Sequence, residues 1–216
     1  QNKDEESLLY AYRLASNYSS KPINLKYADS TLIIAKKQNS KKLLSYAYLN
    51  RGTLYMDDEK YRKALDDILL ANKYSDELGD DYTFNKTDYY ISQNKIYLGL
   101  YEDANNELKN CVEYFKSNSN SNDPLGKSYS MYYLYSMMSY LDTNTKIGKQ
   151  DENKALIDEV LKYIKNNKLE QYTPYFISIE GTDAFYKKDY KTAIEKLTQS
   201  LTSYNDQWSH NTDIYY

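Results

Sequence analysis

Few residues in this chain could take part in catalysis, and their types and spacing do not assemble a reactive site. His210 is the only histidine and Cys111 the only cysteine. A lone histidine cannot form a paired-histidine metal site or complete a triad without a suitably placed nucleophile. Carboxylates such as Asp57 and Asp80 fall at expected turns and helix starts, where acidic groups interact favourably with the helix dipole. We therefore expect a non-catalytic protein that needs no metal or cofactor.

The composition favours a folded, all-helical chain. Of the 216 residues, 41% are hydrophobic and 27% charged, which is ordinary for a globular protein. The 6 Gly and 3 Pro are too few for the many turns of a β-sandwich or barrel. A net charge of −3, with both signs mixed along the chain, argues against direct nucleic-acid binding. No apolar run reaches the ~18 residues expected of a membrane span.

The chain contains an internal repeat, and this repeat indicates how its helices are arranged. Gly52, Tyr61, Ala64 and Ala71 recur at identical offsets as Gly181, Tyr190, Ala193 and Ser200, and a third copy contains Ser92, Tyr101, Ala104 and Cys111. Small residues at fixed helical spacing allow two helices to cross closely, because larger side chains would push them apart. The pattern therefore predicts helix pairs packed in sequence order.

This pattern resembles the tetratricopeptide repeat family. The resemblance implies one domain over residues 1–216, a curved, right-handed α-solenoid of about five helix pairs. We expect the units at about 9–42, 45–78, 85–118, 125–167 and 174–207, with the start of a further unit at 212–216. Pro22 is expected to open a helix, and Ala155 to be the small residue of the fourth unit. Polar loops are expected at 117–124 and 142–151.

The family resemblance also implies a concave groove lined by the first helices of the pairs, where a peptide or another protein would bind. The residues implied to face the groove are Tyr46, Leu49, Thr53, Lys86, Tyr89, Gln93, Tyr175 and Thr182. Tyrosines give contact area at low entropic cost, and amides and hydroxyls can bind peptide backbone. The alternative is that the 28 tyrosines reflect free use of this residue, since buried helix faces also contain aromatic rings.

A more specific expectation concerns the first three units. Some tetratricopeptide co-chaperones bind a peptide's terminal carboxylate with Lys and Asn in the first unit, Asn in the second and Lys in the third. Arg13, Asn17, Asn50 and Lys86 stand at the equivalent positions, although Arg13 replaces a Lys and Tyr90 stands where a further Arg is usual. Cationic and amide donors would make charge-assisted bonds to a carboxylate. The alternative is a solvated polar helix face.

Two functions follow from the resemblance. The irregular repeat spacing is similar to that of the ligand-sensing region of bacterial regulators with an AraC-type helix-turn-helix domain, which implies a signalling role in a transcription regulator. The alternative is a constitutive scaffold or co-chaperone-type adaptor that binds partner C-termini. A homodimer through the end units is a further expectation.

The two ends of the chain suggest where it is located. Its polar start at Gln1, without an initiator Met, suggests that a signal peptide has been removed, which favours the bacterial periplasm over the cytoplasm. The apolar pattern that begins near Tyr216 suggests that the natural chain continues beyond it.

Overall fold

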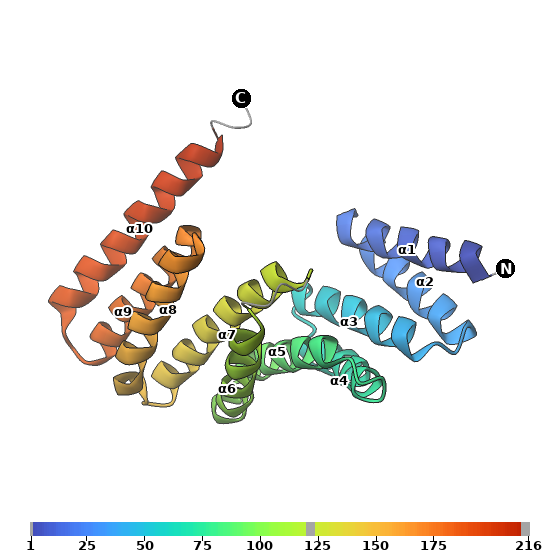
Figure 1. The fold of residues 1–216 in the computed structure, drawn as a ribbon, viewed down its shortest axis with the longest axis horizontal. Helices are drawn as coiled ribbons and strands as arrows, with labels where there is room; N and C mark the ends of the chain where they lie inside the picture. The colour runs from blue at the N-terminus through green and yellow to red at the C-terminus, as the bar shows by residue number, and fades with distance from the viewer. Residues whose placement is uncertain (1, 120–123, 213–216) are drawn as a thin grey trace. The chain divides into compact units, whose positions relative to one another are not determined.

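The computed structural model describes residues 2–119 and 124–212, with side chains described for 7–119 and 124–203. These residues form ten α-helices and two short 3-10 helices, with no strand in this part of the chain (Figure 1). The predicted all-α class is therefore confirmed for the described residues. The start of a further unit at 212–216 lies outside them, apart from Thr212.

The helices divide into two compact units, Gln1–Leu100 and Tyr101–Tyr216. The first contains α1 (Asn2–Tyr18), α2 (Ile23–Lys37), α3 (Lys41–Asp57), α4 (Tyr61–Asp76) and α5 (Asp81–Tyr97). The second contains α6 (Tyr101–Asn118), α7 (Gly126–Lys146), η1 (Gln150–Glu152), α8 (Asn153–Asn167), η2 (Glu170–Tyr172), α9 (Thr173–Tyr186) and α10 (Tyr190–Thr212). Consecutive helices pack together within each unit, as Figure 1 shows for α3 with α4 and α9 with α10. The expected third pair, 85–118, consists of α5 and α6 from different units and stays a prediction.

Close helix crossings occur where the sequence repeats its glycines. A Cβ added at Gly52 on α3 would lie 2.5 Å from Ile68 Cγ1 on α4. A Cβ added at Gly181 on α9 would lie 2.8 Å from Leu197 Cγ on α10. The other small residues of the repeat are also buried, namely Ala64, Ala71, Ser92, Ala104, Cys111, Ala193 and Ser200. The expectation that small residues allow these helices to approach is therefore confirmed.

The joints between helices follow from local chemistry. Pro22 directly precedes α2, as expected from its fixed φ. Gly79 has a φ of 64°, a left-handed conformation that costs glycine little, and it lies just past the end of α4. The Asp80 carboxylate then accepts the Thr83 backbone N–H at 3.0 Å and caps α5. The short turn between Asp76 and Asp81 is therefore enough to pack α5 against α4.

The first unit has an apolar core, and beside it the half-buried Arg51 pairs with the buried Asp67. Leu32, Leu44 and Ile68 are among its buried side chains. Arg51 on α3 donates to both carboxylate oxygens of Asp67 on α4, with Nε–Oδ2 2.7 Å and Nη2–Oδ1 2.8 Å. Its Nη1 also donates to Asp29 on α2 at 2.8 Å. This fork-shaped contact ties α3 to both neighbouring helices and fixes the rotation of α3 about its axis.

The prediction of a polar loop at 142–151 was wrong for residues 142–146. Helix α7 continues to Lys146, and only 147–149 separate it from η1. The side chains of Thr143, Asn144 and Thr145 are buried rather than solvated. Their hydrogen bonds inside the unit compensate for the lost contact with water, which a reading of polarity alone cannot detect.

These side chains belong to a buried polar network that begins on α6. Asn105 Nδ2 donates to Asn144 Oδ1 at 2.7 Å and to Thr143 Oγ1 at 2.9 Å. Asn144 Nδ2 in turn donates to Asn153 Oδ1 on α8 at 3.0 Å. Amide side chains thus connect three helices through groups that water does not reach.

The network ends at a carboxylate on α9. Asn153 Nδ2 donates to Asp183 Oδ2 at 2.9 Å and to the Leu141 carbonyl at 3.0 Å. The Thr145 hydroxyl donates to Asp183 Oδ1. Burial raises the pKa of Asp183, and its hydrogen bonds with Thr145 and Asn153 oppose that shift. Four helices are therefore joined by one set of hydrogen-bonded polar groups.

The helix α8 also corrects a second expectation. Ala155 is exposed, and the buried side chains of α8 are Asn153, Ile157, Val160 and Ile164. Ala155 is therefore not the small residue at a helix crossing. The buried face of α8 begins with the network amide of Asn153 instead.

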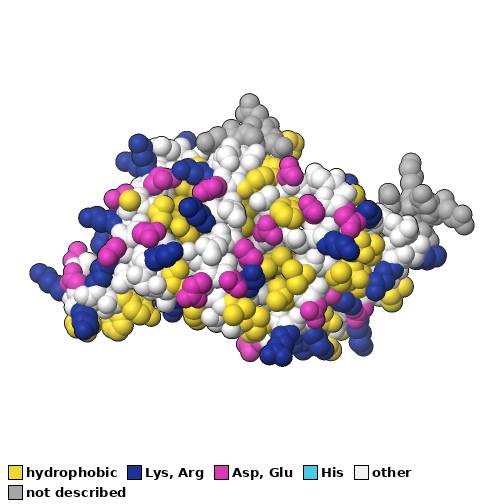
Figure 2. Space-filling model, turned by 90° about the horizontal axis from the view of Figure 1, so that it is seen from below, with side chains coloured by type: hydrophobic (Ala, Val, Ile, Leu, Met, Phe, Trp, Pro, Cys, Tyr) yellow, Lys and Arg dark blue, Asp and Glu magenta, His cyan; other side chains and the backbone are white. Residues whose placement is uncertain are grey.

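The described surface is mixed in character. Figure 2 shows Lys and Arg interspersed with Asp and Glu and with hydrophobic side chains across the face that it displays. Among the described residues, no helix has both the length and the hydropathy that crossing a membrane requires.

Replacing Gly52 with Ala is expected to destabilise the chain. The added Cβ would overlap Ile68 Cγ1, and this strain outweighs the gain in helix propensity, so the free energy of unfolding should fall by about 1–2 kcal/mol. Chemical denaturation followed by circular dichroism measures it. Ile68→Ala should cost less in the Gly52→Ala background than in the native chain, because it removes the overlap. Additive effects would contradict the close crossing.

Replacing Asn153 with Ala should remove donors from Asp183 and leave buried polar groups unpaired. We expect a loss of about 2–3 kcal/mol in the free energy of unfolding. Asn167→Ala is the matched control, because Asn167 is an exposed asparagine at the end of the same helix and should change stability by less than about 0.5 kcal/mol. Equal effects of the two variants would show that the network does not stabilise the unit.

Candidate functional site

The first unit contains a cavity of about 220 Å³ between α1, α3 and α5. It is lined by Arg13, Asn17, Tyr46, Leu49, Asn50, Thr53, Lys86 and Tyr90. All of these except Tyr90 are residues that the sequence predicted to bind a ligand. The structure thus brings most of the predicted site together around one recess.

Helical spacing explains why these side chains converge. On α3, Tyr46, Leu49, Asn50 and Thr53 follow the spacing of a single helix face. On α1 and α5, the lining residues are four apart in each case, as Arg13 and Asn17 illustrate. Because neighbouring residues on α3 pack against α2 and α4, the polar face of α3 is left to line the cavity.

A chain of hydrogen bonds orients the amides of the site. The Ser16 hydroxyl donates to Asn50 Oδ1 at 2.7 Å, and Asn50 Nδ2 donates to Asn17 Oδ1 at 2.7 Å. The Thr53 hydroxyl donates to the Asn50 carbonyl at 2.9 Å. Because both side-chain oxygens already accept hydrogen bonds, the N–H groups of Asn17 and the second N–H of Asn50 are the amide groups that can donate into the cavity.

Two cations define the electrostatics of the cavity. Its lining residues include Arg13 and Lys86 and, among the described residues, no carboxylate. Burial, and secondarily the positive charge of Arg13, lower the pKa of Lys86. The Arg13 guanidinium lies 5.2 Å from the Tyr10 ring centroid, and its buried Nε has no hydrogen-bond acceptor in the described part of the chain. The recess therefore offers donors and positive charge to a ligand that accepts.

The remaining predicted site residues lie elsewhere. Tyr89 and Gln93 are on α5 but do not line the cavity, and the Tyr89 ring packs edge-on against Tyr90 with centroids 5.3 Å apart. Tyr175 and Thr182 are on α9 of the second unit and do not line it either. Tyr90 is the lining residue that the site prediction omitted. Its position four residues after Lys86 on the same helix was the available signal.

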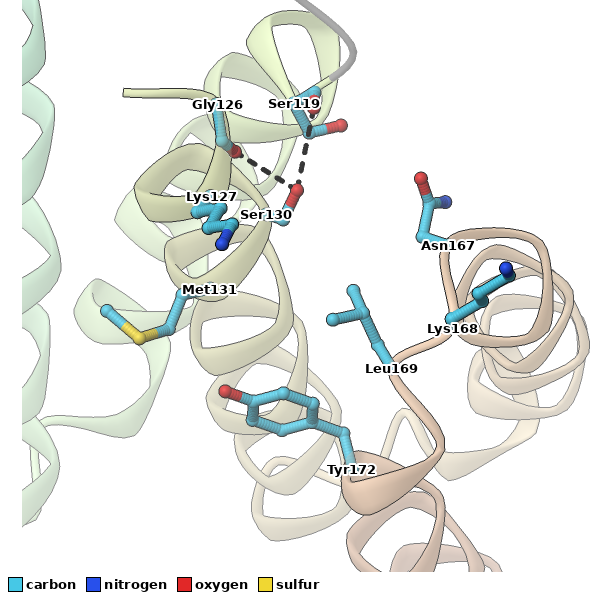
Figure 3. A pocket seen from close by; sticks show the side chains of 9 residues that line it. All are labelled: Ser119, Gly126, Lys127, Ser130, Met131, Asn167, Lys168, Leu169 and Tyr172. Atoms are coloured by element: carbon cyan, nitrogen blue, oxygen red, sulfur yellow. Dashed lines mark hydrogen bonds between the residues drawn. The ribbon is translucent and has the colours of Figure 1, made fainter. Parts of the chain in front are cut away.

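A larger cavity of about 770 Å³ lies in the second unit, and none of the predicted site residues lines it. Figure 3 shows Leu169 and Tyr172 pointing toward α7, with Asn167 and Lys168 at the end of α8. The Ser130 hydroxyl donates to the Gly126 carbonyl at 3.1 Å and accepts from the Tyr163 hydroxyl at 2.9 Å. Its hydrogen bonds are thus made within the protein. The smaller cavity is the one at which the predicted site residues meet.

Removing the charge of Arg13 should raise the pKa of Lys86. The Arg13→Gln variant removes the repulsion between the two cations, whereas burial remains, so the pKa should rise yet stay below the ordinary value. Side-chain NMR of isotope-labelled lysine during a pH titration measures this. Arg62→Gln, which changes an exposed arginine on α4, should leave the pKa of Lys86 unchanged. A fall in the pKa after Arg13→Gln would contradict the proximity of the two cations.

Comparisons with known proteins identify no relative. No protein-family model matches the chain, and a search of curated proteins found no significant match. The resemblance to the tetratricopeptide family therefore rests on the repeat spacing and stays a prediction.

Proposed function

We propose that this chain is a non-catalytic binding module of the tetratricopeptide type, in which the cavity of the first unit binds the terminal carboxylate of a peptide or protein. The observation that carries the proposal is the convergence of Arg13, Lys86 and Asn17 on a recess whose described lining contains no carboxylate. A carboxylate would relieve the repulsion between the two cations and accept charge-assisted hydrogen bonds from them.

The size of the cavity supports a chain end as the ligand. Its volume of about 220 Å³ is below the range of about 300–1,000 Å³ typical of sites for drug-sized molecules. It is therefore suited to a carboxylate with one small side chain, while the rest of a peptide lies outside it. Tyr46 and Leu49 supply the aromatic and apolar contacts that such a residue needs.

The proposed solenoid is supported by the packing within each unit. Consecutive helices lie together, and glycines of the repeat lie at the crossings of α3 with α4 and of α9 with α10. In a solenoid of this type the first helices line one concave side, which is consistent with a cavity between α1, α3 and α5. Binding of the C-termini of partner proteins is the activity expected of a scaffold or co-chaperone-type adaptor. A ligand-sensing role in a larger bacterial regulator would use the same cavity.

The proposal predicts that binding needs a free C-terminus. A pool of short peptides with free carboxylates should bind the whole chain, and the same pool with amidated C-termini should bind at least about tenfold more weakly, because the charge-assisted bonds are lost. Calorimetry and NMR shift changes at Asn17 and Asn50 measure the binding.

Variants make the test specific to the cavity. Arg13→Gln and Lys86→Gln should each weaken binding of the free-carboxylate pool. Lys127→Gln is the matched control, because Lys127 lines the larger cavity in the second unit. Equal binding of amidated peptides, or an equal loss in Lys127→Gln, would overturn the proposal.

A further inference from the structure

A third cavity, of about 430 Å³, lies in the second unit between α8, α9 and α10. Ile157 and Ala184 give it apolar walls, and both are at least nine-tenths buried. Charged side chains of both signs surround these walls, in contrast to the cation-rich cavity of the first unit. Its volume falls in the range of sites for small organic molecules.

Several of these charges are already compensated within the protein. Lys196 Nζ lies 2.8 Å from Glu180 Oε2, and Lys187 Nζ lies 2.7 Å from Asp151 Oδ1. Asp189 accepts the Thr192 backbone N–H at 3.2 Å as the cap of α10. These groups therefore have partners without a ligand.

Two hydrogen-bond acceptors at the cavity can accept further hydrogen bonds. Asp183 is 7% exposed, and its carboxylate accepts hydrogen bonds from Thr145 and Asn153, fewer than two carboxylate oxygens can take. Gln150 Oε1 is buried and has no hydrogen-bond donor among the described residues. A buried acceptor without a donor is costly, so a ligand that donates hydrogen bonds to these acceptors would be stabilised in the cavity.

One donor at the cavity is also available. Lys154 is exposed, and the structure gives it no partner in the described part of the chain. A simple cation would meet Lys154 and Lys187 as repulsive neighbours, and a simple anion would meet Asp183. A metal ion is disfavoured, because no group of three His, Cys, Asp or Glu suited to it is found among the described residues. A ligand that complements these groups is therefore a small molecule with one positive and one negative charge.

We propose that this cavity binds a free α-amino acid, whose ammonium donates to Asp183 and Gln150 Oε1 and whose carboxylate is bound by Lys154. An ammonium has three N–H donors, which suits the two buried acceptors, Asp183 and Gln150 Oε1. The carboxylate then pairs with Lys154, which is exposed. The side chain of the amino acid packs against Ile157 and Ala184.

The test is calorimetry of the whole chain with each standard amino acid, compared with its N-acetyl and its amide derivatives. At least one free amino acid should bind at millimolar concentration or below, and both derivatives should bind about tenfold more weakly or worse, because each lacks one charge. The measurement is repeated with the Arg13→Gln, Lys86→Gln double variant, so that the carboxylate site of the first unit does not contribute.

Variants separate ligand contact from folding. Lys154→Gln should weaken binding at least about fivefold, whereas Lys191→Gln, an exposed lysine of α10 that does not line the cavity, should leave it unchanged. Asp183→Asn should abolish binding while the variant keeps the helical circular dichroism of the native chain, so that loss of ligand contact is distinguished from loss of folding. Absence of binding by every free amino acid, equal binding of the N-acetyl forms, or equal loss in Lys191→Gln would overturn the proposal.

Discussion

The close crossing of helices at small residues is the constraint on which the rest of the structure depends. At Gly52 there is no room for a Cβ beside Ile68, so the backbone of α3 packs directly against the Ile68 side chain of α4. Arg51, the preceding residue, then reaches Asp67 and Asp29 on both neighbouring helices. With one face of α3 fixed in this way, the opposite face is directed to the cavity. A substitution at the crossing of α3 and α4 would therefore alter the first-unit cavity, although the substituted residue does not line it.

The second unit is held by a different kind of contact. A line of amides, hydroxyls and one carboxylate joins α6, α7, α8 and α9, and its members are buried. Such networks favour one arrangement of the helices, because a buried polar group that loses its hydrogen-bond partner costs free energy in a low dielectric. Asp183 has a second role in this arrangement, because the same carboxylate lines a cavity. The network therefore fixes the position of a group that the proposed amino-acid site uses.

The two proposed sites differ in charge for reasons that are visible in their helices. In the first unit, Asp29 and Asp67 pair with Arg51, and the charged residues that line the cavity are Arg13 and Lys86. In the second unit, the cavity is lined by lysines and carboxylates together, and Lys196 on α10 pairs with Glu180 on α9. A ligand with one negative charge suits the first cavity. A ligand with both charges suits the third.

Composition favoured the helical class, and spacing along single helices located the small residues at the crossings, because a sequence displays both directly. The resemblance to the tetratricopeptide family implied most of the residues that line the first cavity. The packing of different helices against one another was needed to show that Thr143, Asn144 and Thr145 are buried in a helix, that Ala155 is exposed, and that Asp183 borders a cavity. A polar residue is buried only where partners from other helices satisfy it, and Asn105, Asn153 and Asp183 come from three different helices, far apart in the chain.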